Sequence, residues 1–209
     1  MNQSPVASPQ SLTSNPFPLV IVGHVDHGKS TLIGRLLHDT GTLPEAKFEQ
    51  IKKSSKARGM EFEWAFLMDA LKAERDQNVT IDLSHIRFRS KNREYVIIDA
   101  PGHREFLKNM VSGAAASEAA VMVIDAEEGV KEQSLRHGYL LSLLGQKQVI
   151  VAINKMDLVS YSETRFREVK KEFEGYLASL GIKAAAYIPV SAREGENLTT
   201  HSGQMQWYR

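Results

Sequence analysis

A glycine-rich segment near the start of the chain has the residue types and spacing of a phosphate-binding site. It runs from Gly23 to Ser30 with the sequence GHVDHGKS and matches the pattern G-x-x-x-x-G-K-[S/T], in which backbone N–H groups point at phosphate oxygens. An apolar run precedes it and helically spaced leucines follow, so the positive end of a helix dipole adds to the site. An ordinary glycine turn would leave the adjacent lysine and serine unexplained. Lys29 is expected at the β- and γ-phosphates and Ser30 on Mg²⁺. The predicted phosphate-binding residues are Asp26, His27, Gly28, Lys29, Ser30 and Thr31.

A second segment, Asn154-Lys155-Met156-Asp157, ends a predicted strand and carries groups that can select a base. The Asp157 carboxylate can accept two parallel hydrogen bonds from the ring N–H and the exocyclic amine of guanine, a pairing that adenine does not offer. Asn154 is expected to bond the N7 side of guanine and to tie this loop to the glycine-rich segment, while the Lys155 stem lies along the base. Ser191 and Ala192 follow the next apolar strand, where a backbone N–H would meet the guanine carbonyl oxygen. A helix cap at a strand end is the alternative for this segment alone, but its place in the chain favours guanine.

Candidate groups for the metal and for hydrolysis lie between these two segments. Asp99 begins the sequence DAPGH at the end of a predicted strand, so it can hold Mg²⁺ through a water, while the Gly102 N–H meets the γ-phosphate. Thr80 is the candidate second hydroxyl ligand of Mg²⁺, and His103 is the candidate that orients an attacking water. Each has a simpler alternative: DAPG is a good turn, a threonine often begins a strand, and a loop histidine can be partly exposed.

Two further observations limit the predicted chemistry. The side chains of His24 and His27 are expected to be loop residues rather than ligands, with their backbone serving the phosphate site. No arginine stands out as a built-in group for stabilising the transition state. We therefore predict slow intrinsic turnover that a partner accelerates.

Strands and helices alternate along the chain, which predicts an α/β fold with a mainly parallel sheet and helices on both faces. Apolar runs predict the strands Leu19–Val22, Ile81–Phe88, Tyr95–Ile98, Ala119–Asp125, Gln148–Asn154 and Ala184–Val190. Helical spacing and composition predict helices within Lys29–Leu37, Pro44–Arg75, Glu105–Ala116, Glu132–Leu144 and Ser162–Leu180.

The composition indicates one domain without a strong electrostatic preference for a partner. The chain has 209 residues, 42% of them hydrophobic, and a net charge of +1, which gives no broad reason to expect nucleic acid or an anionic membrane. It has no cysteine, which excludes disulfides and thiolate metal sites. Its apolar runs are too short to span a membrane, and its start lacks the pattern of a secretion signal, so a cytoplasmic protein is expected. Residues 1–17 are predicted to be a flexible segment and residues 18–209 the globular domain.

Taken together, these segments resemble the GTPase domain of the translational-factor superfamily. The resemblance covers about Pro18 to Arg209, and it is carried by GHVDHGKSTLIGRLL, KAERDQNVTID, DAPGHREFLKNMVSG, NKMDL and the Ser191–Ala192 pair. It implies a P-loop GTPase fold with a mostly parallel six-stranded sheet, one antiparallel edge strand and flanking helices. It also implies GTP and GDP as ligands, Mg²⁺ as the cofactor, and hydrolysis of GTP to GDP and phosphate. One departure is Asn78, where many relatives have glycine.

Two branches of the superfamily share these segments. GHVDHGKS and DAPGHREF resemble the tRNA-carrying elongation factors, whereas MDLVSYSE, RHGYLLSLLG and the closing Trp207–Tyr208 resemble the large subunit of bacterial sulfate adenylyltransferase. The preferred prediction is the second branch, with a small ATP-sulfurylase subunit as partner and a domain truncated before its last helix. Delivery of aminoacyl-tRNA, with tRNA or the ribosome as partner, is the first alternative; the basic residues Lys47, Lys52, Lys53, Lys56 and Arg58 fit it, although a solvated helix face explains them too. A nucleotide-dependent interaction module with little hydrolysis is the second alternative.

Overall fold

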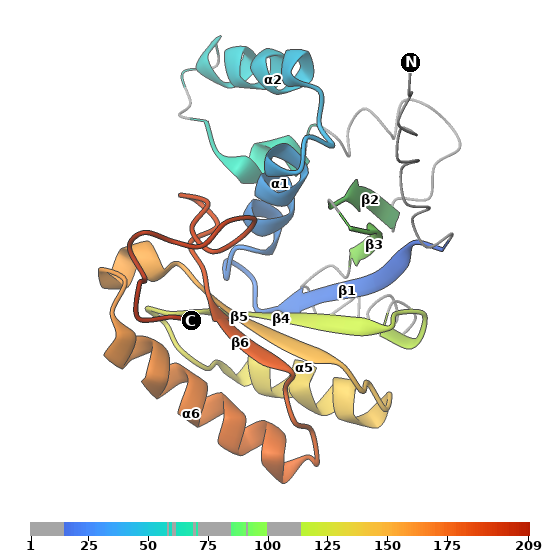
Figure 1. The fold of residues 1–209 in the computed structure, drawn as a ribbon, viewed down its shortest axis with the longest axis vertical. Coiled ribbons are helices and arrows are strands. Elements are labelled where there is room, and N and C mark those ends of the chain that lie inside the picture. The colour runs from blue at the N-terminus through green and yellow to red at the C-terminus, as the bar shows by residue number, and fades with distance from the viewer. Residues whose placement is uncertain are drawn as a thin grey trace, which may run out of the picture.

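A six-stranded sheet forms the centre of the molecule (Figure 1). In the computed structural model, residues 15–57, 59, 62–68, 70, 85–90, 92–99 and 114–209 are described. The strand order across the sheet is β2-β3-β1-β4-β5-β6, and the pairing of β2 with β3 is antiparallel while the others are parallel. The strands are β1 (Phe17–Gly23), β2 (His85–Arg89), β3 (Glu94–Asp99), β4 (Ala119–Asp125), β5 (Val149–Asn154) and β6 (Ala186–Pro189).

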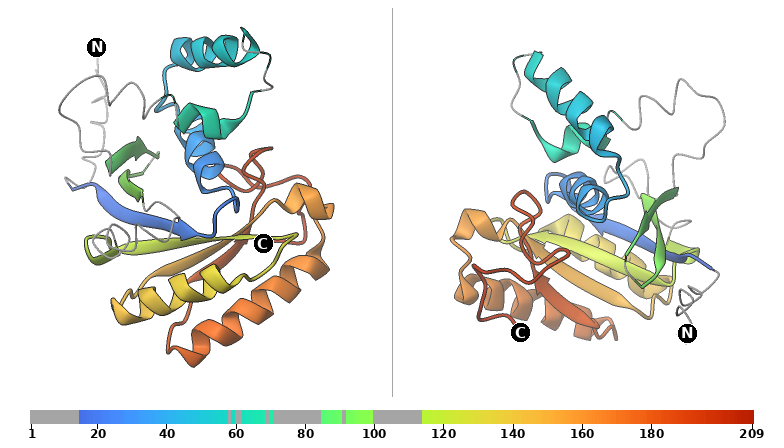
Figure 2. Two further views of the ribbon diagram at one scale, coloured as in Figure 1. Left: turned by 180° about the vertical axis from the view of Figure 1, so that it is seen from behind. Right: turned by 45° about the horizontal axis from the view of Figure 1, so that its top comes forward.

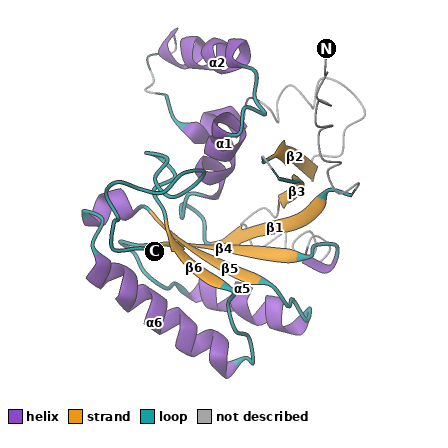
Figure 3. Ribbon diagram, in the orientation of Figure 1, coloured by secondary structure: helices purple, strands orange, loops and turns teal. Residues whose placement is uncertain are grey.

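Helices cover both faces of this sheet, as the two further views in Figure 2 show. Helices α5 (Glu132–Leu143) and α6 (Glu163–Ser179) lie on one face and α1 (Lys29–Asp39) on the other, and α2 (Glu45–Ala57) lies beyond α1. A short 3₁₀ turn, η2 (Met156–Val159), follows β5 (Figure 3). The predicted fold is therefore confirmed: a mostly parallel sheet with one antiparallel edge strand and helices on both faces.

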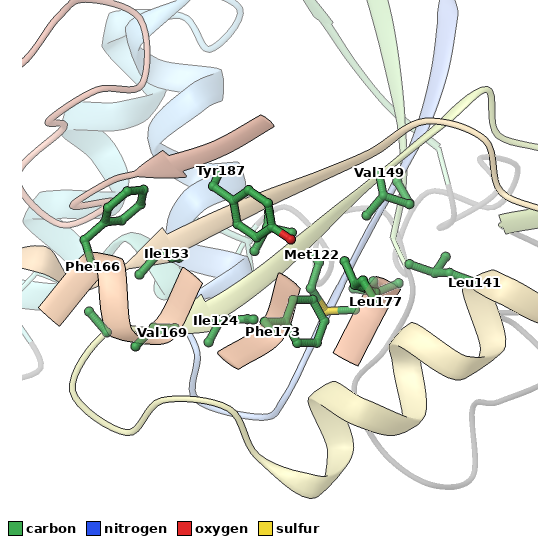
Figure 4. Packing of buried hydrophobic residues seen from close by; sticks show 14 of the residues in the cluster. Met122, Ile124, Leu141, Val149, Ile153, Phe166, Val169, Phe173, Leu177 and Tyr187 are labelled. Carbon is green, nitrogen blue, oxygen red and sulfur yellow. The ribbon is translucent and has the colours of Figure 1, made fainter. Parts of the chain in front are cut away.

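The alternation of side chains along the strands explains the two layers of helices. In β1, Val20 and Val22 are buried with the α5 and α6 side chains, whereas Leu19 and Ile21 are buried with the α1 side chains. Parallel strands that are covered on both faces read as continuous apolar runs, which is the pattern seen here. In the hydrophobic cluster between the sheet and helices α5 and α6, Phe173 and Leu177 of α6 pack with Met122 of β4 (Figure 4).

Some element ends differ from the sequence prediction. Strand β1 begins at Phe17 rather than Leu19, because Phe17 and Pro18 continue the parallel pairing with β3. The Phe17 ring also packs edge-on against Tyr95, with ring centroids 6.0 Å apart. Strand β2 begins at His85 within the described residues, and most of the predicted helix at Glu105–Ala116 lies outside them. Pairing with β3 thus begins β1 two residues before its predicted start.

The segment after β6 packs without forming a helix. Residues 190–209 form turns and one isolated bridge, between Ser191 and Glu196. Met205 is 1% exposed, and the Trp207 Nε1–H donates to the Tyr161 carbonyl oxygen at 3.1 Å. Among the described residues, no helix combines the length and apolar character needed to cross a membrane.

Candidate functional site

The glycine-rich segment forms a tight loop between β1 and α1. Gly28 is the N-cap residue of α1 and has φ of 89°, and Asp26 has φ of 65°. Both residues therefore have a left-handed backbone conformation. A Cβ on Gly28 would collide with the side-chain amide of Asn154, and a Cβ on Gly23 would collide with the Val123 carbonyl oxygen. The two glycines of the motif are therefore required by close approach to β4 and β5 as well as by backbone conformation.

The Lys29 side chain reaches back to the start of the glycine-rich loop. Its ammonium donates hydrogen bonds to the carbonyl oxygens of Gly23, at 2.9 Å, and His24, at 2.7 Å. Ser30 and Thr31 are in the first turn of α1, where backbone N–H groups have no partner within the helix. This arrangement places a positive charge and a helix N-terminus at one end of the site, which suits phosphate.

Asn154 joins the two predicted halves of the site. Its Nδ2 donates to the His27 carbonyl oxygen at 2.9 Å, and its Oδ1 accepts from the Ala192 N–H at 2.9 Å. Asn154 is 1% exposed, so both hydrogen bonds are shielded from water. Three segments that are far apart in the sequence are thus held together by one amide side chain.

The Asp157 carboxylate is oriented by its neighbour across the loop. The Ser191 hydroxyl donates to Asp157 Oδ1 at 2.6 Å. Asp157 lines the same cavity as Asn154, so the predicted base-selecting residues are brought together. A backbone N–H of the Ser191–Ala192 pair was expected to meet the guanine carbonyl oxygen. In this structure the Ala192 N–H donates to Asn154 Oδ1 and the Ser191 N–H donates to the Glu196 carbonyl oxygen.

Asp125 is a positioning residue that sequence reasoning missed. It ends β4 in register with Asn154, and its side chain is 1% exposed. Its Oδ2 lies 2.6 Å from the Lys155 ammonium, while its Oδ1 accepts the Glu127 N–H at 2.7 Å. Lys155 has a left-handed backbone with φ of 62°, so this ion pair helps to fix an unfavourable conformation. A polar residue at the end of an otherwise apolar strand was the available signal.

A cavity of about 570 Å³ connects the phosphate end to the base end of the site. This volume lies within the usual range for small-molecule sites. Its lining contains predicted residues from both ends, and it also contains an unpredicted wall from the segment after α2 and from the loop after Ala192. The lining residues are Gly28, Thr31, Phe62, Glu63, Trp64, Asn154, Lys155, Asp157, Leu158, Arg193 and Glu194.

The predicted hydrolysis residues are only partly covered by the structure. Thr80, Gly102 and His103 lie outside the described residues. The backbone of Asp99 is described: it ends β3 and pairs with Ile21, on the strand that leads into the glycine-rich loop. The strand register thus agrees with the predicted position of Asp99, and the roles of its side chain and of the other three residues stay predictions.

One buried histidine belongs to the loop, and a second lies within electrostatic range of it. His27 is fully buried, its Nδ1 lies 3.2 Å from the Val123 carbonyl oxygen, and burial lowers its pKa. Burial lowers the pKa of His137 on α5 to about 4, and the positive charge of Lys29 adds to this effect. Both imidazoles are therefore neutral at pH 7 and act as packing groups.

The low pKa of His137 makes the fold sensitive to acid. Its pKa falls from 6.5 to about 4 on folding, so the unfolded chain binds the proton more tightly between these values. Stability contributed by the neutral side chain is complete above pH 6.5 and is lost as the pH falls toward 4, at a cost of about 3 kcal/mol. We expect His137→Gln to flatten the pH dependence of the free energy of unfolding by this amount, measured by urea denaturation. The exposed His201→Gln is the control, and equal slopes in the two variants would contradict this assignment.

The comparisons with known proteins agree with this geometry. The family model of the elongation factor Tu GTP binding domain matches residues 16–205. Elongation factor 1-alpha of Pyrococcus furiosus is 50% identical over 193 residues, which cover 91% of this chain and 44% of that protein. The corresponding factor of Methanospirillum hungatei is 44% identical over 194 residues, 91% of this chain and 46% of that protein. The chain therefore spans about half the length of the curated relatives that it matches.

A solved structure also resembles the chain. The structure of sup35 complexed with GMPPNP has a TM-score of 0.64 and 26% identity, covering 94% of this chain and 42% of that one. The elongation factors favour the translation alternative over the preferred sulfate-activation prediction, and they give no support to a small ATP-sulfurylase partner. The match over residues 16–205 and the 50% identity to elongation factor 1-alpha show that the chain belongs to the elongation factor Tu GTP-binding domain family, whose members are GTP-binding domains of the translation-factor type.

Proposed function

We propose that the cavity between Gly28 and Asp157 binds GTP with Mg²⁺ and that the domain hydrolyses GTP: water adds to the γ-phosphorus, the bond to the β–γ bridging oxygen breaks, and GDP and phosphate leave. The observation that carries this proposal is the Asn154 side chain, which joins the phosphate loop to the base-selecting loop at 2.9 Å on each side. Lys29 contacts the β- and γ-phosphates, and Asp157 accepts the guanine N–H and amine hydrogens. The GTP and GDP states differ in the order of the segments around Thr80 and after Gly102.

The chain offers a suitable set of oxygen ligands for Mg²⁺. Magnesium is commonly held by one or two protein groups together with substrate phosphates. Ser30, next to Lys29 in the first turn of α1, supplies one hydroxyl at the phosphate end. Asp99 and Thr80 are proposed to complete the protein side of the site, with Asp99 acting through a water. When bound, Mg²⁺ neutralises charge that develops on the phosphates.

His103 is proposed to orient the attacking water. We expect His103→Ala to slow single-turnover GTP hydrolysis by about 100-fold, because general acid–base and water-orienting groups contribute on this scale. GDP affinity should stay within a factor of about two, since the imidazole acts only on the γ-phosphate side. Phosphate release and GDP titration calorimetry measure the two quantities.

The exposed His201→Ala is the control for this experiment and should hydrolyse GTP at the unmodified rate. Undiminished turnover in His103→Ala would remove His103 from the mechanism. If the unmodified chain binds GTP but does not turn it over, with or without a partner, the domain is instead a nucleotide-dependent interaction module.

In the larger protein, we propose that the nucleotide state controls a translation partner such as tRNA or the ribosome. The elongation factors 1-alpha support this role over sulfate activation, although MDLVSYSE and RHGYLLSLLG resemble the sulfate-activating branch. Purification of the protein from its source distinguishes the two. Co-purifying tRNA in the GTP state supports translation, and a co-purifying ATP-sulfurylase subunit refutes it.

A further inference from the structure

The lining of the cavity contains a tryptophan, Trp64, that none of the predicted motifs includes. Trp64 belongs to the segment that follows α2, and its indole Nε1–H donates to the Arg193 carbonyl oxygen at 3.2 Å. The same oxygen accepts a hydrogen bond from Arg35 Nη1 of α1 at 3.0 Å. Arg193 directly follows Ser191 and Ala192. The Arg193 carbonyl oxygen thus accepts hydrogen bonds from Arg35 of α1 and from Trp64, which both come earlier in the sequence than the loop that contains Arg193.

The indole of Trp64 is held in this orientation by its neighbours. It stacks on Phe48 of α2 with ring centroids 5.5 Å apart and an interplanar angle of 17°. Phe62 and His38 meet it edge-on, at 5.2 and 5.1 Å. The Arg35 guanidinium lies 4.9 Å from the ring centroid, and Arg35 Nε is itself paired with Asp39 at 2.9 Å. Rotation of the indole would lose several of these contacts together, so the N–H is preorganised.

The loop that Trp64 holds orients the base-selecting groups. The Ser191 hydroxyl fixes Asp157 Oδ1 at 2.6 Å, and the Ala192 N–H fixes Asn154 Oδ1 at 2.9 Å. Within this loop, the Gly195 N–H donates to the Ser191 carbonyl oxygen at 2.7 Å, so Arg193 is part of a closed turn. Displacement of the Arg193 carbonyl therefore moves Ser191 and loosens the Asp157 carboxylate.

We propose that Trp64 is a positioning residue for guanine selection, acting through the Arg193 carbonyl on Ser191 and Asp157. This inference rests on the proposed binding of guanine nucleotide in the cavity. The competing explanation is that Trp64 only packs α2 against α1 and affects stability alone. The two differ in what they predict for discrimination between bases, because a packing defect alone weakens the binding of all nucleotides alike.

The test compares GDP with IDP, whose base lacks the exocyclic amine of guanine. Trp64→Phe keeps an aromatic ring for Phe48 and Arg35 but removes the N–H donor to Arg193. Loss of one hydrogen bond of this kind is expected to reduce the ratio of GDP to IDP affinity by about 2- to 10-fold. Isothermal titration of both nucleotides gives the ratio, and thermal unfolding reports stability separately.

Trp207 provides a matched control. Its indole also donates to a backbone carbonyl, that of Tyr161 at 3.1 Å, and it does not line the cavity. Trp207→Phe is expected to keep the GDP to IDP ratio unchanged. An unchanged ratio in Trp64→Phe would overturn the inference alone. Failure of the unmodified chain to bind GDP would overturn the proposed function and, with it, the inference.

Fluorescence supplies an independent measurement. The chain has two tryptophans, so Trp64 is the only one in the Trp207→Phe variant. Because Trp64 lines the cavity, saturation with GDP is expected to change the intensity or the emission maximum of this single tryptophan. An emission spectrum that stays the same while calorimetry shows GDP binding would contradict the placement of Trp64 beside the nucleotide.

Discussion

Replacing Asp157 with asparagine is expected to lower the affinity for GDP by about 1,000-fold or more and to create affinity for xanthosine diphosphate. A buried group that hydrogen-bonds its substrate rejects mismatched partners strongly, because a mismatch leaves donors or acceptors unpaired. The Ser191 hydroxyl donates to Asp157 Oδ1, so in the variant the side-chain oxygen stays on Ser191 and the amide N–H₂ faces the cavity. That amide can donate to the additional carbonyl oxygen of xanthine but cannot accept from the guanine amine.

Calorimetric titration with GDP and with xanthosine diphosphate measures this exchange of preference. Glu94→Gln is a control, because it also converts a carboxylate to an amide, on a partly exposed strand residue whose partner is Arg87 at 3.3 Å. The control should prefer GDP as the unmodified chain does. A preference for GDP that survives in Asp157→Asn would refute the assignment of the base-selecting carboxylate.

Removing the side chain of Asn154 is expected to weaken the binding of the whole nucleotide by about 100-fold or more. In Asn154→Ala, the buried His27 carbonyl and the Ala192 N–H each lose a hydrogen-bond partner. Each unsatisfied buried group costs about 1–3 kcal/mol, so the two loops separate unless binding energy holds them together. GDP affinity by calorimetry and the unfolding temperature should both fall.

Asn197 provides a matched comparison for this variant. It too bridges two segments, because its Nδ2 donates to the Pro189 carbonyl oxygen at 3.0 Å and its Oδ1 accepts the Ser202 N–H at 2.6 Å. It does not line the cavity proposed to hold the nucleotide. Asn197→Ala should therefore lower the unfolding temperature with a change in GDP affinity of less than about threefold. If the two variants lose affinity equally, the effect of Asn154 is one of general stability.

The sequence predicted the bounds of those elements whose ends are marked by a polar residue. Strand β4 has the predicted bounds, Ala119–Asp125, because both of its faces are buried and a charged residue ends it. Helix α6 begins after Ser162, whose hydroxyl accepts the Arg165 N–H, and this helix start is visible in the sequence. Local chemistry therefore located these elements to within a residue or two.

Of three contacts between distant segments around the cavity, the sequence predicted one. The predicted hydrogen bond between Asn154 and the glycine-rich segment was found, because the motif itself carries that spacing. The Trp64–Arg193 hydrogen bond and the Lys155–Asp125 ion pair depend on how separate elements pack in three dimensions. No periodicity or motif marks Trp64 as part of a nucleotide cavity. The side chains of Thr80 and His103 stay predictions that rest on their order in the chain.

The parallel strands also give the sheet two different ends: the carboxyl ends of the strands and their amino ends. Strands β1, β4 and β5 end at Gly23, Asp125 and Asn154, so the loops around the proposed nucleotide cavity all leave the sheet at its carboxyl rim. The connections that lead into β5 and β6 lie at the opposite rim of the sheet, and Lys147 and Lys183 are exposed in them. A dye, affinity handle or inserted peptide at those two lysines would therefore be separated from the proposed nucleotide cavity by the length of the strands, so this rim is the place to modify the protein without disturbing the cavity.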